Sequence, residues 1–268
     1  MNYRKALGTS IIMMIVGMSP IVLSVIITVA ANTTDLETYT VTFAYLIGAI
    51  LCIPIADKGL NIKFREHIRK PEAKVLVPLI MSAVFYEIFS VYIVYGDSLE
   101  SSANAANGAL SAKDIFSVIG LILISPVSED LIFRYAMLTV LIIASAGNKI
   151  KISLSILIVS LFWVVPHYSG SFIRNADIAV VGLVIGALYF LGKNILYCII
   201  FHSTLNTVVS IYALSQGFRK LIYEHPYISY ISLAVSILFL AVMYVNLYKD
   251  RKYHEFQFPD TLKELSSK

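Results

Sequence analysis

The sequence has 268 residues, of which 58% are hydrophobic and only 14% are charged, and its mean hydropathy is +0.78. A soluble domain carries about 25% charged residues, so this composition excludes a soluble globular protein and indicates an integral membrane protein. The net charge of +4 comes from basic residues gathered between apolar runs, which points to a membrane surface and not to nucleic acid. The two cysteines, Cys52 and Cys198, lie within apolar runs and suggest neither a disulfide framework nor a CxxC metal site.

Apolar runs of about 20 residues recur along the chain without the alternation typical of a β-barrel. We therefore predict an all-α fold, a polytopic bundle of about eight transmembrane helices. The first run is longer than the apolar part of a signal peptide, so we expect it to be retained as a span. In chain order, the predicted spans cover roughly residues 10–30, 39–56, 75–95, 114–146, 152–167, 178–192, 195–215 and 227–247.

The basic residues test this topology, because cytoplasmic loops are enriched in Lys and Arg. With both termini in the cytoplasm, sixteen basic residues fall on the inner side and four on the outer side. The most basic loop, residues 57–74, is expected to lie against the anionic inner leaflet as an orientation anchor. The polar outer loop, residues 96–114, is expected to be a flexible connector. The inner set is Arg4, Lys5, Lys58, Lys63, Arg65, Arg69, Lys70, Lys74, Lys149, Lys151, Lys193, Lys249, Arg251, Lys252, Lys263 and Lys268; the outer set is Lys113, Arg174, Arg219 and Lys220.

Charged groups inside the fourth predicted span are expensive to bury and are therefore candidates for function. In SEDLIFR (residues 128–134), Asp130 and Arg134 are four residues apart and can form an ion pair on one helix face. Glu129 is rotated by about 100° from Asp130 and has no basic partner in its own helix, which suits a general base or acid. A packing network of all three charges is the structural alternative.

Pro126 precedes these charges and should break or kink the long span 114–146. We expect Ser125 to cap a fresh helix with Pro126 at its first position. In the span 178–192, Gly182 and Gly186 form a GxxxG pattern, which predicts close packing against another helix.

Two further polar stretches lie in later spans. In FWVVPH, Trp163 and His167 are four residues apart, so the indole could wall a pocket that contains the histidine; both residues could equally anchor the chain at the membrane interface. In FHSTLN, His202 and Asn206 also share a helix face and could donate hydrogen bonds to an oxyanion, or could instead hold helices together.

In this order and spacing, the three stretches resemble the CPBP family, which comprises the type II CAAX prenyl endopeptidases and their bacterial relatives, also called the Abi family. Its pattern is EExxxR, then an aromatic residue four before a histidine, then HxxxN. This sequence departs from the pattern at Asp130, which replaces the second glutamate, and at Trp163, which replaces phenylalanine; Tyr135 stands where glycine is common. The resemblance covers residues 110–215, flanked by N-terminal helices in 1–109 and a last helix and tail in 216–268, all within one structural domain.

The resemblance implies an intramembrane peptidase of the glutamate type that needs no obligatory metal or other cofactor. Glu129 and His167 would activate water, and His202 with Asn206 would stabilise the oxyanion. Asp130 and Arg134, with Trp163 beside them, would support the site. A zinc site formed by Glu129, His167 and His202 remains an alternative.

The implied partners are the lipid bilayer and a peptide or protein substrate in or at the membrane. Small precursor peptides are the expected substrates in a bacterium, and prenylated CAAX proteins in a eukaryote. The alternatives are a non-catalytic scaffold or bacteriocin-immunity protein with the same fold, and a proton-coupled transporter, against which stands the lack of internal repeats.

The depths in the membrane that the predicted spans give to the candidate site residues disagree. At about 1.5 Å per residue, His202 should lie about 10 Å closer to the inner face than Glu129 and His167. Either helix tilt or a kink closes this distance, or the boundary of the span 195–215 is wrong; we favour the boundary error.

Overall fold

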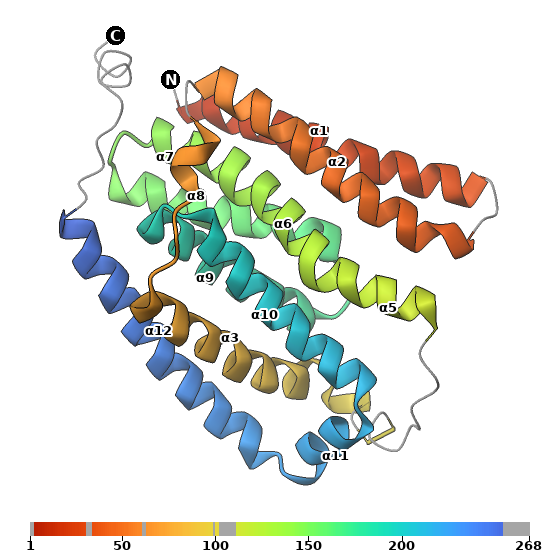
Figure 1. Cartoon of the computed structure of the whole chain (residues 1–268). Coiled ribbons are helices and arrows are strands. Elements are labelled where there is room, and N and C mark those ends of the chain that lie inside the picture. Colours follow the sequence, from red (N-terminus) through yellow and green to blue (C-terminus); the bar gives the residue numbers. More distant parts are fainter. Residues whose placement is uncertain (1–2, 31–33, 61–62, 99, 102–110, 254–268) are drawn as a thin grey trace.

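The computed structural model describes residues 3–30, 34–60, 63–98, 100–101 and 111–253, which are almost entirely helical and contain no strand (Figure 1). Seven helices in this part of the chain are long and apolar enough to cross a membrane. The prediction of an all-α, polytopic membrane bundle is confirmed. The α-helices are α1 (Tyr3–Ala30), α2 (Thr34–Leu60), α3 (Ala73–Val94), α5 (Ala112–Ile119), α6 (Ser125–Asp130), α7 (Thr139–Ala144), α8 (Lys149–Val164), α9 (Phe172–Gly192), α10 (Ile195–Leu214), α11 (Gln216–Glu224) and α12 (Tyr227–Tyr253).

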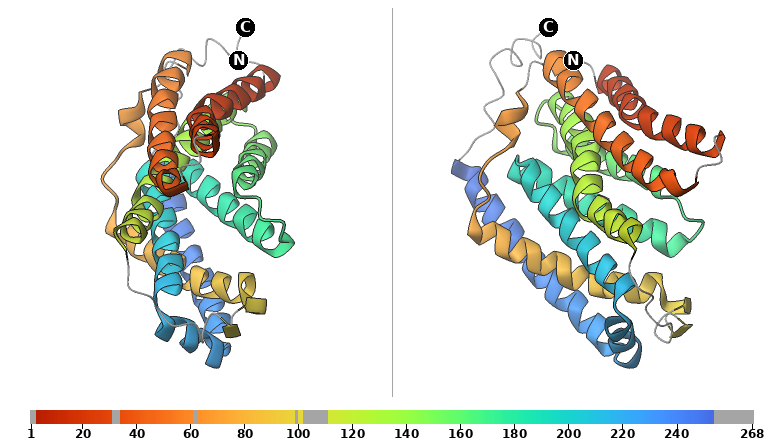
Figure 2. Two further views of the ribbon diagram at one scale, coloured as in Figure 1. Left: turned by 90° about the vertical axis from the view of Figure 1, so that its right-hand side faces the viewer. Right: turned by 45° about the vertical axis from the view of Figure 1, so that its right-hand side comes forward.

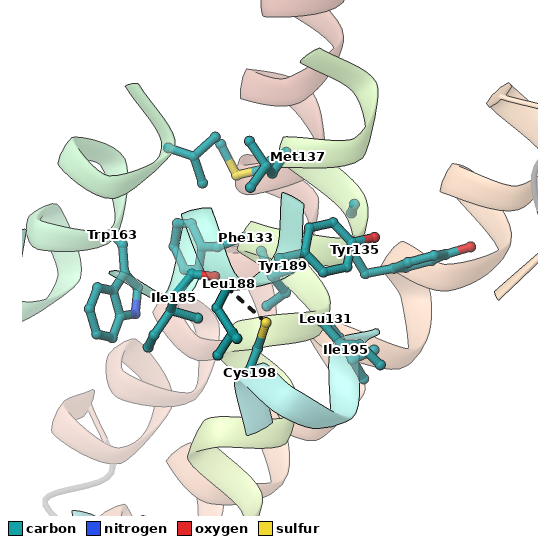
Figure 3. Close-up of a cluster of buried hydrophobic side chains, with 14 of the residues drawn as sticks. Leu131, Phe133, Tyr135, Met137, Trp163, Ile185, Leu188, Tyr189, Ile195 and Cys198 are labelled. Atoms are coloured by element: carbon teal, nitrogen blue, oxygen red, sulfur yellow. Dashed lines mark hydrogen bonds between the residues drawn. The ribbon is translucent and has the colours of Figure 1, made fainter. Parts of the chain in front are cut away.

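A central helical path runs through the bundle between two helix pairs. It consists of α5, the π-helical η3 (Gly120–Ile124), α6, the π-helical η4 (Leu131–Leu138) and α7. The pair α1/α2 lies on one side of this path and the pair α3/α12 on the other, as the views in Figure 2 show. Every residue of η4 is buried, and its side chains meet those of α8, α9 and α10 in the core (Figure 3). The outer helices expose many large apolar side chains, as lipid contact requires.

The predicted break at Pro126 does not occur. Ser125 has helical φ and ψ angles of −60° and −51°, so it is not the expected N-cap, and the helix continues through Pro126. The π-helical turn of η3 precedes the proline. In a π-helix each N–H bonds the carbonyl five residues earlier, as the Ser125 N–H does with Gly120. This wider turn accommodates the missing proline N–H without ending the helix.

The basic end of the bundle, which carries Lys5, Lys58, Lys149 and Lys193, is crossed by an extended segment between α2 and α3 (Figure 1). We call residues 63–72 of this segment the strap; it includes the short 3₁₀-helix η1 (Phe64–His67). The strap covers the turn between α9 and α10, where Asn194 is only 2% exposed.

The covered turn explains the difference in predicted depth, which we had attributed to a wrong boundary of the span 195–215. Helix α10 spans Ile195–Leu214, in agreement with the predicted span, so the boundary was right and the explanation was wrong. Because Asn194 is buried beneath the strap, α10 begins inside the bundle and not at its surface. His202 can therefore reach the level of Asp130, from which it is separated by 3.6 Å.

The structure differs from the sequence prediction at two loops as well. The short amphipathic α11 (Gln216–Glu224), which packs against α10 and α3, was not predicted. The expected flexible connector, residues 96–114, contains the 3₁₀-helix η2 (Gly96–Ser98) and the start of α5; residues 99 and 102–110 lie outside the described part, as do the basic residues of the tail after residue 253.

Candidate active site

The three polar stretches converge at the middle of the bundle. Glu129 comes from α6, His167 from the 3₁₀-helix η5 (Val165–His167) at the end of α8, and His202 from α10. Trp163 of α8 lies between them, with its ring centroid 5.1 Å from that of His167 and 5.3 Å from that of His202. Residues far apart in the sequence thus form one polar cluster in an apolar bundle.

Glu129 is 2% exposed and is held from two sides. Its Oε1 accepts a short hydrogen bond from the Ser125 hydroxyl, one helical turn earlier. Its Oε2 accepts a hydrogen bond from Trp163 Nε1 at 2.6 Å. These two donors fix the position of the carboxylate and satisfy both of its oxygens.

His167 faces the same carboxylate, with its Nε2 at 3.5 Å from Glu129 Oε2. Its Nδ1 lies 2.8 Å from the carbonyl of Trp163, and because a carbonyl only accepts, Nδ1 carries a hydrogen. In the neutral ring Nε2 is then an acceptor, so the contact with Glu129 is attractive only when a proton lies between the two groups. Glu129 and His167 are therefore arranged to share a proton, and the partial exposure of His167 leaves this pair open on one side.

Asp130 lies close to two basic side chains despite being shorter than the glutamate of the family pattern. Its Oδ1 lies 3.3 Å from Arg134 Nε, as the four-residue spacing predicts, and its Oδ2 lies 3.6 Å from His202 Nδ1. The Arg134 guanidinium also lies 4.4 Å above the ring of Trp163, in cation–π contact. Asp130 can thus orient His202 while Arg134 balances its charge.

Asn206 does not point at Glu129; its amide Nδ2 donates to the carbonyl of Leu121 at 2.8 Å. In the i to i+5 pattern of η3 that carbonyl would be paired with the N–H of residue 126, which is a proline and has none. The Asn206 side chain supplies the missing donor and links α10 to the helix that carries Glu129. One N–H of the amide remains for an oxyanion.

Sequence reasoning did not identify Ser125 as a partner of Glu129 or Leu121 as a partner of Asn206. The first could have been found, because residues four apart share a helix face. The second depends on the packing of α10 against η3, for which the sequence holds no local signal.

The zinc alternative gains no support from the geometry. Within the described ranges, no three His, Cys, Asp or Glu side chains lie as a metal-ligand set. Glu129 uses both of its oxygens for Ser125, Trp163 and His167.

Comparison with known families addresses the segment that holds these residues. Residues 111–208 match the model of the family described as type II CAAX prenyl endopeptidase Rce1-like. The predicted resemblance is confirmed over this segment, which contains all three polar stretches. Neither the curated proteins nor the solved structures gave a match.

The Rce1-like segment extends from α5 to most of α10. The helices α1, α2, α3 and α12 and the strap lie outside it. The match supports a multi-pass membrane protein with a CAAX protease-like fold, and it leaves the activity of the site to experiment.

Proposed function

We propose that the chain is an intramembrane endopeptidase of the glutamate type that cleaves membrane-associated or small precursor peptides. The observation that carries this proposal is the Glu129–His167 pair: a buried carboxylate, fixed by two donors, faces an imidazole that is open on one side. This pairing of a carboxylate with a histidine suits the removal of a proton from water.

In the proposed reaction, Glu129 and His167 take a proton from a water molecule, and the water oxygen bonds to the carbonyl carbon of the scissile peptide. His202 and the remaining N–H of Asn206 stabilise the oxyanion. The proton then passes to the peptide nitrogen, the C–N bond breaks, and a carboxylate and an amine leave. Asp130 and Arg134 hold His202 and the Trp163 ring in place.

The setting of the reaction follows from the same proposal. The distribution of basic residues supports an orientation with both termini in the cytoplasm, and we assign the chain to a bacterial cell membrane. Small leader, pheromone or bacteriocin precursors are the substrates that such a location offers.

The alternative is a non-catalytic scaffold or immunity protein with the same fold. The replacement of glutamate by Asp130 is the feature that favours it, whereas the closeness of Asp130 to both Arg134 and His202 favours an intact site.

The test compares peptides released by membranes that contain the wild-type chain, His167→Ala or His202→Ala, with mass spectrometry as the readout. We expect peptides that appear only with the wild type. Equal peptide profiles in all three membranes would favour the scaffold.

A further inference from the structure

The strap (residues 63–72) is attached firmly to the helix turn beneath it. The backbone N–H of Arg69 donates to Asn194 Oδ1 at 3.3 Å, and Asn194 Nδ2 donates back to the Arg69 carbonyl at 2.8 Å. The backbone N–H of Glu72 donates to the Tyr197 hydroxyl at 3.1 Å. These contacts give the strap a defined position at the start of α10, the helix that carries His202.

A second set of contacts joins the strap region to the helix that carries Glu129. Tyr135, which directly follows Arg134 in η4, donates a short hydrogen bond to Asp57, and its ring meets Phe64 edge to face at 4.8 Å. His67 Nδ1 lies 2.8 Å from the Tyr189 hydroxyl, which in turn lies 2.7 Å from the Thr139 hydroxyl. The position of the strap and the position of η4 are therefore linked through buried side chains.

The outward side of the strap is basic. Four of its side chains are exposed bases, and the apolar Ile68 beside them is 41% exposed. Glu66 and Glu72 are its acidic residues, and Glu72 is paired with Lys74 at 3.0 Å. The exposed bases are Lys63, Arg65, Arg69 and Lys70.

We propose that the strap binds anionic phospholipid headgroups and that this binding stabilises the arrangement of the site. Clustered bases next to a membrane attract anionic lipids, and an exposed apolar side chain such as Ile68 can enter the interface. We call the strap seated when it lies against the turn between α9 and α10, and released when it has left this turn. A lipid that binds the seated strap more tightly than the released strap shifts the equilibrium between these two states toward the seated one. Because Tyr135 contacts the strap region and directly follows Arg134 in the chain, we expect a change in the position of the strap to affect Arg134 and the candidate site through Tyr135. The regulatory part rests on the proposed function, whereas the lipid binding does not.

The chain provides its own reporter for the coupling. Trp163 is the only tryptophan, and its indole contacts Glu129 and Arg134. Its emission therefore reports on the site without any substrate, and hydrogen exchange at the N–H groups of Arg69 and Glu72 reports on the strap.

The experiment uses the full chain in vesicles of phosphatidylcholine, with or without phosphatidylglycerol. We expect phosphatidylglycerol to slow exchange at Arg69 and Glu72 by about fivefold or more and to shift the Trp163 emission, with both effects lost at high salt. Arg65→Gln with Lys70→Gln should lose both effects. The matched variant Lys149→Gln with Lys151→Gln, which removes two exposed bases at the same end of the bundle, should keep them.

Equal exchange in the two kinds of vesicle, or an unchanged response in the Arg65→Gln, Lys70→Gln variant, would overturn the lipid-binding proposal. Tyr135→Phe separates the two parts, because it removes the bond to Asp57 and leaves the basic side chains intact. We expect slowed exchange without the Trp163 shift in this variant; an unchanged shift would overturn the coupling. No readout requires peptide cleavage, so an inactive chain can still confirm the binding.

Discussion

Trp163 contacts four members of the candidate site at once. Its indole N–H donates to Glu129, its ring face lies under the Arg134 guanidinium, and its ring meets those of His167 and His202 edge to face. The sequence left open whether Trp163 walls a pocket or anchors the chain at the membrane interface. It could not predict the hydrogen bond, because that depends on how α8 packs against the central helix.

Replacing Trp163 by Phe should slow peptide cleavage by about 10- to 100-fold, because a hydrogen bond to a charged group contributes about 1.5–3 kcal/mol. The phenyl ring keeps most of the packing, so the folded state should persist. Cleavage rates and thermal unfolding of both proteins check this. An unchanged rate would show that the Trp163 bond has no part in positioning Glu129.

The Asp130–Arg134 pair shows what spacing alone can predict. The contact follows from residues four apart in a helical segment, and the structure contains it. The contact of Asp130 with His202 joins two helices, and only the shared family pattern brought these residues together in the sequence analysis.

At the scale of the helical elements, the hydrogen bond between Asn206 and Leu121 predicts a change in stability that can be measured without any peptide cleavage. Asn206→Leu should leave the Leu121 carbonyl unpaired and lower the free energy of unfolding by about 1–3 kcal/mol. Pro126→Ala restores a backbone N–H at the position that pairs with this carbonyl in a π-helical turn.

The double variant should therefore lose less stability than the sum of the two single variants, as measured by denaturant unfolding in mixed micelles. Strict additivity would contradict a shared role of Pro126 and Asn206 at Leu121.

Gly182 tests the packing of α9 against α8. A Cβ atom there would lie 3.0 Å from both Ser160 Cβ and Trp163 Cε3, so the predicted close-packing face is present. Gly182→Val should push α8 and its indole away and cost about 1–3 kcal/mol. Gly8→Val is the matched control, because a Cβ on Gly8 meets no atom within 4 Å. A similar change in unfolding temperature for both variants would contradict this interpretation.

The apolar runs predicted the long helices, because a membrane span needs a continuous apolar stretch, although some predicted ends differ by up to seven residues, as at Tyr3 of α1. Helix α10 is an example, with its start predicted correctly. Of the break or kink predicted at Pro126, the break does not occur, because a π-helical turn can absorb a proline without ending the helix. The nine-residue α11 was missed because it is too short and too polar to resemble a span.

On the scale of the whole molecule, the strap closes the basic end of the bundle and should respond to pH. Burial lowers the pKa of His67 to about 4, well below the usual value of about 6.5. Other charged groups act on it as well: the bases Arg69 and Lys193 lower the pKa further, and the acids Glu66 and Asp57 oppose them.

As the pH falls from about 6.5 toward 4, a released strap binds a proton that the seated strap excludes, so seating weakens over this window. Above pH 6.5 both forms are neutral and seating is unaffected. Exchange at the Arg69 and Glu72 amides, corrected for intrinsic rates, should be faster at pH 5 than at pH 7. His67→Asn should remove the difference; a difference of the same size in that variant would assign the pH dependence to another group.

The bundle and its membrane character could be anticipated from composition, and the polar residues that converge at the candidate site could be anticipated from motif order. The strap could not, because it follows from contacts between residues far apart in the sequence, such as Arg69 with Asn194, which is 125 positions away. Sequence reasoning treated this loop as an orientation anchor, whereas the structure also makes it the cover of α10.

The most direct test of the central claim is the rate at which purified Glu129→Gln cleaves a peptide that the wild-type chain cleaves in the same vesicles. Glutamine keeps the shape of Glu129 but cannot take a proton from water. We predict that cleavage slows by about 100-fold or more, the loss expected when a general base is removed. A Glu129→Gln chain that cleaves the peptide at the wild-type rate would contradict a glutamate-type peptidase.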